Sequence, residues 1–219
     1  MGGYATEPAI VKYHFATPDD YHVLKERYTR GVQGEVNADL STLKPYTEAM
    51  KNIVRKAYDE YASYANIKFI EVDDPLDADT NLFSANLTGV HSGSSAYAFL
   101  GGNIWWSNGY ANVQSGHSPF AYYTALHEIG HTLNMRHTHD NFKGDYLPED
   151  SLEFSVLSYK PYMNYSMYLN MGGLRMYDLA HIHRQFGVNP NARSGDDVYT
   201  FKNYNTVLGD GDRYIWDGN

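Results

Sequence analysis

The segment LHEIGHTLNMRH, residues 126–137, constrains the fold more than any other stretch of the chain. His127 and His131 are four residues apart, so on a helix their rings project from one face, one turn apart. If the helix continued, His137 would lie about 9 Å beyond His131 along the axis and on a different face, at a rise of ~1.5 Å per residue. The three rings can therefore meet only if the helix stops near residue 134 and the chain turns back.

A turn of this kind needs a residue in the left-handed backbone region, where glycine is favoured. Asn134 occupies the position, and asparagine enters that region at a lower cost than most other residues. The sequence therefore predicts a structural turn at Asn134 that brings His137 back to the other two histidines.

Three neutral imidazoles in this arrangement are typical of a zinc site that keeps its fourth position open. Glu128, next to the first histidine, is displaced enough to reach a water on the metal and to act as general base. A bare HExxH pattern is only moderately specific, because histidine pairs on half-buried helices are often structural. The addition of His137 favours the metal site.

The composition excludes some classes of partner. The net charge is −9, and the 17 Lys and Arg residues are scattered, which argues against nucleic acid. No segment reaches the ~20 continuous apolar residues of a membrane span, and the N-terminus does not resemble a signal peptide. The 219 residues include no cysteine, which weakly favours a chain that works outside the cell.

Periodicity predicts one α+β domain. We expect an N-terminal arm and short helix in residues 1–40, a core in residues 41–190 and a separate C-terminal region in 191–219. A long helix over 41–65 is expected to be capped by Ser41 or Thr42, with Pro45 in its first turn. Further elements are expected as follows: strands at 67–74, 80–87, 94–100 and 103–108, a helix at 117–134 capped by Ser118, and a helix at 175–187 ended by Gly187.

Several segments, in order, resemble the serralysin-type bacterial metalloproteases of the metzincin group. The resemblance runs over roughly residues 60–219 and is carried by HEIGHTL, EDSLEFSVLSY, IKFIEV, AYAFLGGNIW, YDLAHIHRQFG and RSGDDVYTF. It implies a metzincin-like zinc peptidase domain. Such a domain has a twisted, mostly parallel sheet with an antiparallel edge strand, a long backing helix and an active-site helix.

The resemblance also implies roles for individual residues. His127, His131 and His137 would bind zinc, and Glu128 would be the general base. Tyr159 matches a tyrosine that can ligate zinc and stabilise the tetrahedral intermediate. Leu157 stands where the family has the methionine of the Met-turn, a replacement of similar volume.

Two further sites follow from the resemblance. An extended substrate would add as a strand along the sheet edge formed by Ala96, Tyr97, Ala98 and Phe99, although the same stretch also reads as an ordinary core strand. Residues 191–219 resemble the start of a calcium-binding region whose repeat solenoid is absent. A calcium ion would be held there by Arg193, Gly195, Asp197 and Asp217, and the alternative is that these residues form acidic surface turns.

The function implied is that of a secreted, extracellular zinc endopeptidase that hydrolyses extended protein substrates through a water activated by Glu128. The alternative is a weakened or inactive zinc-containing domain that binds a protein or peptide, and the departures at Asn134 and Leu157 favour it. The expected partners are protein or peptide substrates, with a proteinaceous inhibitor as a further candidate. We expect a monomer with no nucleic-acid or membrane partner.

Overall fold

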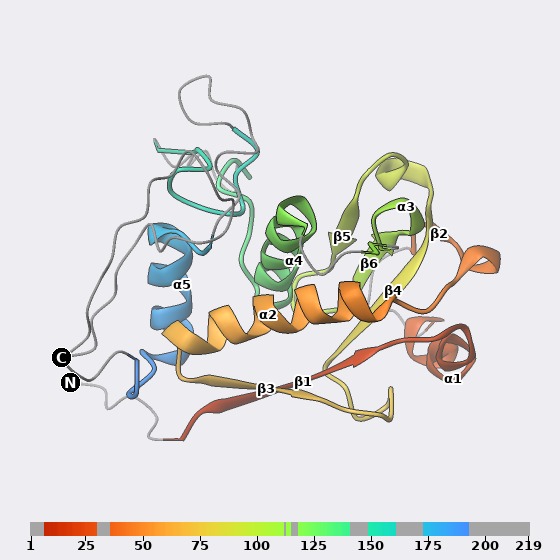
Figure 1. Cartoon of the computed structure of the whole chain (residues 1–219), viewed down its shortest axis with the longest axis horizontal. Helices are drawn as coiled ribbons and strands as arrows, with labels where there is room; N and C mark the ends of the chain where they lie inside the picture. The colour runs from red at the N-terminus through yellow and green to blue at the C-terminus, as the bar shows by residue number, and fades with distance from the viewer. Residues whose placement is uncertain are drawn as a thin grey trace.

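A mostly parallel sheet forms the frame of the protein in the computed structural model (Figure 1). The structure describes residues 7–29, 36–111, 113–114, 118–140, 149–160 and 173–192. Within them the six strands follow the order β3-β1-β4-β6-β5, with β2 paired to β4. The strands are β1 (Ala9–Phe15), β2 (Ala38–Asp39), β3 (Ile67–Glu71), β4 (Thr80–Leu87), β5 (Ala96–Ala98) and β6 (Ile104–Ser107).

Strand direction divides the sheet into a parallel centre and antiparallel additions. β1 is parallel to both β3 and β4, and β4 is parallel to β6. β5 runs antiparallel to β6 at one edge, and β2 runs antiparallel to β4. The prediction of a mostly parallel sheet accompanied by helices is confirmed.

The N-terminal segment takes a place that the sequence analysis did not give it. Residues 9–15, expected in an arm outside the core, form β1, which lies between β3 and β4 in the sheet. Tyr13 and Phe15 are buried in the main core. The sheet thus includes a strand that precedes residue 41.

The helices are α1 (Pro18–Thr29), α2 (Glu48–Tyr64), α3 (Asn108–Ala111), α4 (Pro119–Thr132) and α5 (Met176–Phe186), with short 3₁₀ helices at Leu40–Thr42 and Gly89–His91. The expected cap of the long helix was wrong. Thr47 caps α2, because its hydroxyl accepts the Met50 N–H, and residues 40–42 form a separate turn. Among the described residues, no helix is long and apolar enough to cross a membrane.

Side chains alternate between two cores on opposite faces of the sheet. Leu82, Ile104 and Trp106 belong to the larger core, which they share with α2, α4 and α5. Phe83 and Trp105 point to the opposite face, where Tyr21 of α1 lies 6.1 and 6.3 Å from their ring centres. Because side chains alternate along each strand, one face of the sheet packs against α2 and α4, and the other face packs against α1.

The central helix α4 is buried along nearly all its length. Ser118 caps it as predicted, accepting the Ala121 N–H, and Pro119 follows at the first helical position. The Tyr61 hydroxyl on α2 donates to the Leu126 carbonyl at 2.8 Å. α4 therefore packs against both α2 and the sheet (Figure 1). These contacts fix the position of the helix that carries His127 and His131.

Candidate metal centre

The turn at the end of α4 decides whether three histidines can meet. Asn134 has a φ of 64° and is the one non-glycine residue with positive φ among the described residues. Directly after it, the Met135 N–H donates to the Gly130 carbonyl at 3.0 Å, which closes the helix end. The turn predicted from the sequence is present, and it carries the chain back across the end of α4.

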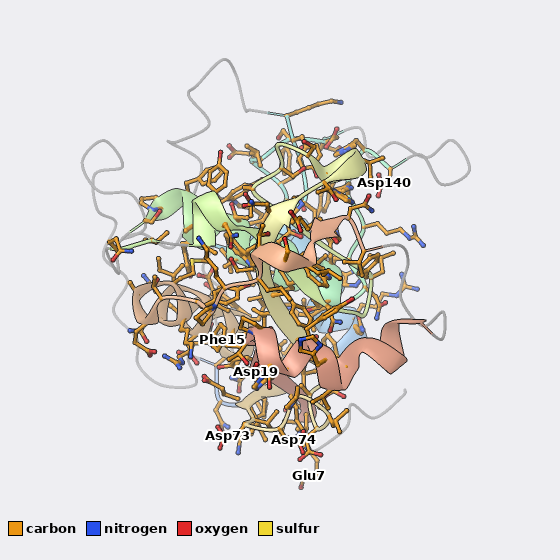
Figure 2. All side chains as sticks on the ribbon, turned by 90° about the vertical axis from the view of Figure 1, so that its right-hand side faces the viewer. Glu7, Phe15, Asp19, Asp73, Asp74 and Asp140 are labelled. Atoms are coloured by element: carbon orange, nitrogen blue, oxygen red, sulfur yellow. The ribbon has the colours of Figure 1, made fainter. Side chains whose placement is uncertain are left out.

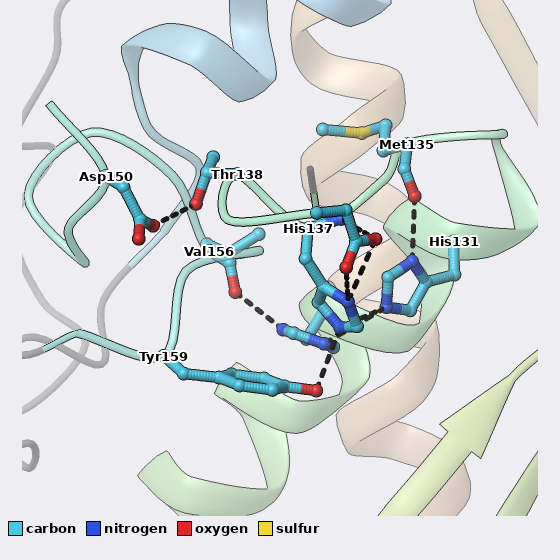
Figure 3. A network of polar contacts seen from close by, with 9 residues as sticks. His131, Met135, His137, Thr138, Asp150, Val156 and Tyr159 are labelled. Carbon is cyan, nitrogen blue, oxygen red and sulfur yellow. Dashed lines mark hydrogen bonds and ion pairs between the residues drawn. The ribbon is translucent and has the colours of Figure 1, made fainter. Parts of the chain in front are cut away.

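The turn brings the three imidazoles together, as Figure 3 shows. Nε2 of His131 lies 3.2 Å from Nε2 of His127 and 3.1 Å from Nε2 of His137. Nitrogen ligands at ~2.0–2.1 Å from a tetrahedral zinc ion lie ~3.3 Å apart. The three nitrogens therefore have nearly the spacing that one zinc ion requires.

The opposite nitrogen of each ring faces an oxygen acceptor. A carbonyl or carboxylate oxygen cannot donate, so each Nδ1 carries the proton and each Nε2 presents its lone pair. The pairs are His127 with the Val156 carbonyl at 2.7 Å, His131 with the Met135 carbonyl at 2.7 Å, and His137 with the Asp140 carboxylate at 3.3 Å. Such outer partners are the usual way that proteins orient metal-binding histidines.

Burial keeps these rings neutral. It lowers the pKa of His127 to about 3 and that of His131 to about 4, and it also lowers the pKa of His137. Three neutral rings with converging lone pairs repel one another unless a cation lies between them. The donor set, its spacing and its protonation state therefore fit zinc.

Glu128 follows His127 on α4 and is buried, with 5% of its surface exposed. Its Oε2 atom has no hydrogen-bond partner among the described residues. Burial raises the pKa of the Glu128 carboxyl to about 8, and a neighbouring dication would favour the ionised form. The side chain borders a pocket of about 320 Å³, whose lining combines His127 and Glu128 with the apolar residues Phe120, Tyr123 and Leu152.

Tyr159 reaches the same place from a distant loop. Its hydroxyl lies 2.8 Å from Nε2 of His137, and its ring stacks on His127 with centres 5.5 Å apart (Figure 3). The tyrosine also lines the pocket beside Glu128. Partial desolvation beside the histidines raises the pKa of Tyr159 to about 12, so its hydroxyl keeps its proton at neutral pH.

The predicted substrate strand borders the pocket at Ala96. Ala96 lines the pocket, whereas Tyr97 and Phe99 pack into the core on the opposite face of the sheet. Hydrogen bonds join residue 107 to residue 95 and residue 99 to residue 103, across the β5–β6 pair. By the alternation of antiparallel pairing, the main-chain groups of Ala96 and Ala98 face the other way, toward the sheet edge.

Leu157 lies under α4, as the resemblance implied. It is buried, and a Cβ added to Gly130 would come within 3.0 Å of its Cδ2 atom. The Leu157 side chain thus packs against α4 one residue before His131. A methionine at this position would have a similar volume.

Two buried aspartates support the site, and the sequence analysis did not identify them. Asp150 accepts a hydrogen bond from Thr138, just after His137 (Figure 3). It also accepts one from Ser158, just before Tyr159. Asp178 in the first turn of α5 accepts bonds from the loop of Val156. Both aspartates lie in segments quoted for the resemblance, but Thr138 and Ser155 lie in other segments than the aspartates that they contact.

Other charged and imidazole groups lie around or far from the centre. The His139 ring stacks on His137 with centres 4.8 Å apart, and together with Asp140 these residues form a second group with metal-ligand atoms. Asp73 and Asp74 lie at the opposite end of the molecule from Asp140 (Figure 2). The predicted calcium residues, Arg193, Gly195, Asp197 and Asp217, lie outside the described residues.

Known proteins resemble this chain over most of its length. The serralysin of Proteus mirabilis is 28% identical over 210 residues, which cover 78% of this chain and 43% of the relative. The metallopeptidase AprA of Pseudomonas marginalis is 25% identical over 212 residues, covering 82% and 44%. Serralysin A of Dickeya chrysanthemi is 31% identical over 166 residues, covering 68% and 35%. No family model matches the chain.

The mostly parallel sheet and the three histidines at the C-terminal end of α4 are compatible with the class of metalloprotease domains. The matches with named relatives narrow that class. The chain contains a metalloprotease domain of the serralysin type. It spans less than half the length of these relatives.

Proposed function

We propose that the chain is a zinc endopeptidase domain that cleaves extended protein substrates. The observation that carries the proposal is the convergence of three imidazole Nε2 atoms, 3.1 and 3.2 Å apart, beside a buried glutamate at a pocket. His127, His131 and His137 would hold the zinc ion. Zinc in such a site lowers the pKa of a water to ~7 and polarises a carbonyl oxygen.

Glu128 is the proposed general base. Its unpartnered Oε2 is free to accept the proton of the attacking water and to pass it to the leaving amine. Because the carboxylate is buried among apolar groups, little bulk water competes for that proton. The amide Glu128→Gln keeps the size of the side chain and cannot take the proton.

Tyr159 is the proposed oxyanion donor and a proposed further zinc ligand. Its protonated hydroxyl lies 2.8 Å from Nε2 of His137, at the metal position. A donor placed there stabilises negative charge that develops on the carbonyl oxygen during attack. The side chain is 58% exposed, which leaves it room to move aside when a substrate enters.

The edge of β5 supports binding of an extended peptide. The main-chain groups of Ala96 and Ala98 face the sheet edge, and Ala96 borders the pocket beside Glu128. A substrate paired with this edge would be recognised mainly through its backbone, which gives broad sequence tolerance. From the family resemblance we also propose an extracellular location, a protein inhibitor as a further partner and calcium as a second ion.

Hydrolysis of casein, measured with the zinc content of the same preparation, tests the proposal. We expect about one zinc per chain, loss of cleavage with a chelator, and recovery when zinc is returned. Glu128→Gln should retain zinc and lose activity by ~10²–10⁴-fold. Zinc binding without cleavage by the unaltered chain would instead support the alternative, a peptide-binding domain.

A further inference from the structure

A continuous chain of buried hydrogen bonds connects Asp178 on α5 to His127 on α4. The Ser155 hydroxyl donates to Oδ1 of Asp178 at 2.6 Å. The same hydroxyl accepts the Leu157 N–H at 3.0 Å. That N–H belongs to the peptide group whose carbonyl, from Val156, accepts the Nδ1 proton of His127 at 2.7 Å.

The direction of every bond in this chain is fixed by chemistry. A backbone N–H can only donate, so Ser155 receives the Leu157 N–H on a lone pair and has one proton left for Asp178. The Val156 carbonyl can only accept, so the proton between it and the imidazole belongs to Nδ1 of His127. Each donor thus points toward the carboxylate.

Burial gives the chain its strength. Asp178, Ser155, Val156, Leu157 and His127 are all buried, with exposed fractions between 0% and 5%. Without water to compete, successive hydrogen bonds polarise one another, by about 10–30% per bond. A negative charge on the carboxylate would therefore make the Val156 carbonyl a better acceptor and the His127 ring a better electron donor.

Capping of α5 explains only part of the Asp178 contacts. Its Oδ2 atom accepts the Arg175 N–H at 2.8 Å, which is the capping bond, and the Val156 N–H at 3.0 Å. The Oδ1 atom is not needed for the cap and is directed to Ser155 instead. A fully buried carboxylate is costly, so a second task at the metal centre would account for its place here.

The three candidate ligands differ in the groups that their Nδ1 atoms contact. Nδ1 of His131 faces only the Met135 carbonyl, and His137 faces the carboxylate of the half-exposed Asp140. Among these three, only His127 is connected by hydrogen bonds to a buried carboxylate, through a serine and a peptide group. A carboxylate behind a metal-binding histidine fixes the ring and raises its basicity.

We propose that Asp178, acting through Ser155 and the Val156–Leu157 peptide group, is a positioning residue that orients and polarises the His127 imidazole as a zinc ligand. The proposal rests on the proposed function for the assignment of His127 to zinc. It needs no proteolytic step, so zinc affinity tests it independently of cleavage.

The experiment compares Ser155→Ala with the unaltered chain by competition for zinc with a chelator of known affinity. We expect zinc affinity to fall at least 10-fold, at the lower end of the effect of outer partners of metal ligands. Ser84→Ala is the matched control, because Ser84 on β4 is also buried and donates to a side chain, Asn108, at 2.8 Å. It should lower thermal stability and leave zinc affinity unchanged.

Two further measurements separate positioning from general support of the fold. In the zinc-loaded protein with labelled histidine, the Nδ1 proton of His127 should move upfield in Ser155→Ala, since its hydrogen bond weakens. Asp178→Asn should also weaken zinc binding, and the double variant should lose no more than the larger single change. Should Asp178→Asn fail to fold, Ser155→Ala carries the test alone.

Either of two results would overturn the proposal. One is a Ser155→Ala protein that loses stability but keeps both its zinc affinity and its His127 proton shift, because the serine would then support only the loop. The other is full additivity of Ser155→Ala and Asp178→Asn in zinc affinity, which would place the two side chains on separate routes. Failure of the unaltered chain to cleave casein would count against the proposed function and not against the role proposed for Asp178 and Ser155.

Discussion

The side chain of Asn134 lies against the backbone of Gly101. A Cβ added to Gly101 would come within 3.1 Å of the Asn134 amide oxygen, and the Gly101 N–H donates to the His131 carbonyl at 3.1 Å. Gly101 itself has a φ of 64°, in the turn between β5 and β6. Asn134, which ends α4, thus contacts the turn between β5 and β6, and β5 is the proposed substrate strand.

Asn134→Ala should destabilise the protein by about 1 kcal/mol, because a residue without the local hydrogen bonding of asparagine meets the left-handed penalty of ~1–2 kcal/mol. The free energy of unfolding of Asn134→Gly should lie within about 1 kcal/mol of that of the unaltered chain. Glycine adopts a φ of 64° without strain, but it has more conformational entropy in the unfolded state. Urea unfolding with and without zinc measures both changes. An alanine variant as stable as the glycine variant would contradict the role given to the backbone conformation.

Asp150 should hold the His137 and Tyr159 loops together. Asp150→Ala leaves the hydroxyls of Thr138 and Ser158 without their acceptor, at a cost of ~1–3 kcal/mol for each buried group. We expect lower zinc affinity and a lower kcat in this variant, with stability measured by thermal unfolding. Lys160→Ala is the comparison, because it removes the exposed cation and leaves the bonds of both hydroxyls to the carboxylate, so its effect on stability should be smaller than that of Asp150→Ala.

Gly130→Ala should be destabilising by ~1–3 kcal/mol, because an added methyl group would meet Leu157 Cδ2 and the Tyr61 hydroxyl, each at 3.0 Å. Calorimetric unfolding of the zinc-free protein measures the loss. Combining it with Leu157→Val should recover part of the stability. Gly109→Ala is the control, because its nearest neighbour would be 4.0 Å away, and it should be close to neutral.

The ion pair between Arg55 and Glu71 predicts a pH dependence of stability. The guanidinium donates to both carboxylate oxygens, at 2.8 and 3.0 Å, and these hydrogen bonds lower the pKa of Glu71. A carboxyl with a lowered folded pKa stabilises the fold above its ordinary value, ~4.3, and loses that contribution as the pH falls through the folded pKa.

Glu71→Gln should therefore lower the Tm at pH 7, and its difference from the unaltered chain should shrink toward pH 3. Both proteins are measured with chelator present, so that loss of metal at low pH does not enter the difference. Glu48→Gln is a suitable comparison, because Glu48 contacts the same arginine but is more exposed, and its effect should be smaller. A constant Tm difference across the range would contradict the assignment.

Local sequence signals predicted the elements that position the candidate ligands. Ser118 and Pro119 begin α4, Asn134 turns the chain, and Gly187 ends α5, each through backbone preferences that act within a few residues. The apolar face of α2 was also predicted, from Met50 to Tyr61, because helical periodicity reports burial directly. The resemblance added Tyr159, whose distance along the chain from His137 hides their contact from any local pattern.

Other features followed from contacts that no local pattern reports. The place of β1 between β3 and β4 was missed, because residues 1–40 were expected to form an arm and a short helix, and the partner strands of β1 lie far along the chain. The start of α2 at Thr47 was missed because Ser41 and Thr42 carry the same capping chemistry, and Thr47 differs from them by its bond to the distant Val113 carbonyl.

The sequence by itself determined the spacing of His127, His131 and His137, the base beside them and the turn that Asn134 allows. These depend on helix geometry and on the φ preferences of single residues, which act locally. The tertiary structure decided that the Val156 carbonyl faces His127, that Asp150 binds Thr138, and that Asp178 reaches the centre through Ser155. Those contacts join residues far apart in the chain, and packing of the whole domain brings them within hydrogen-bond distance.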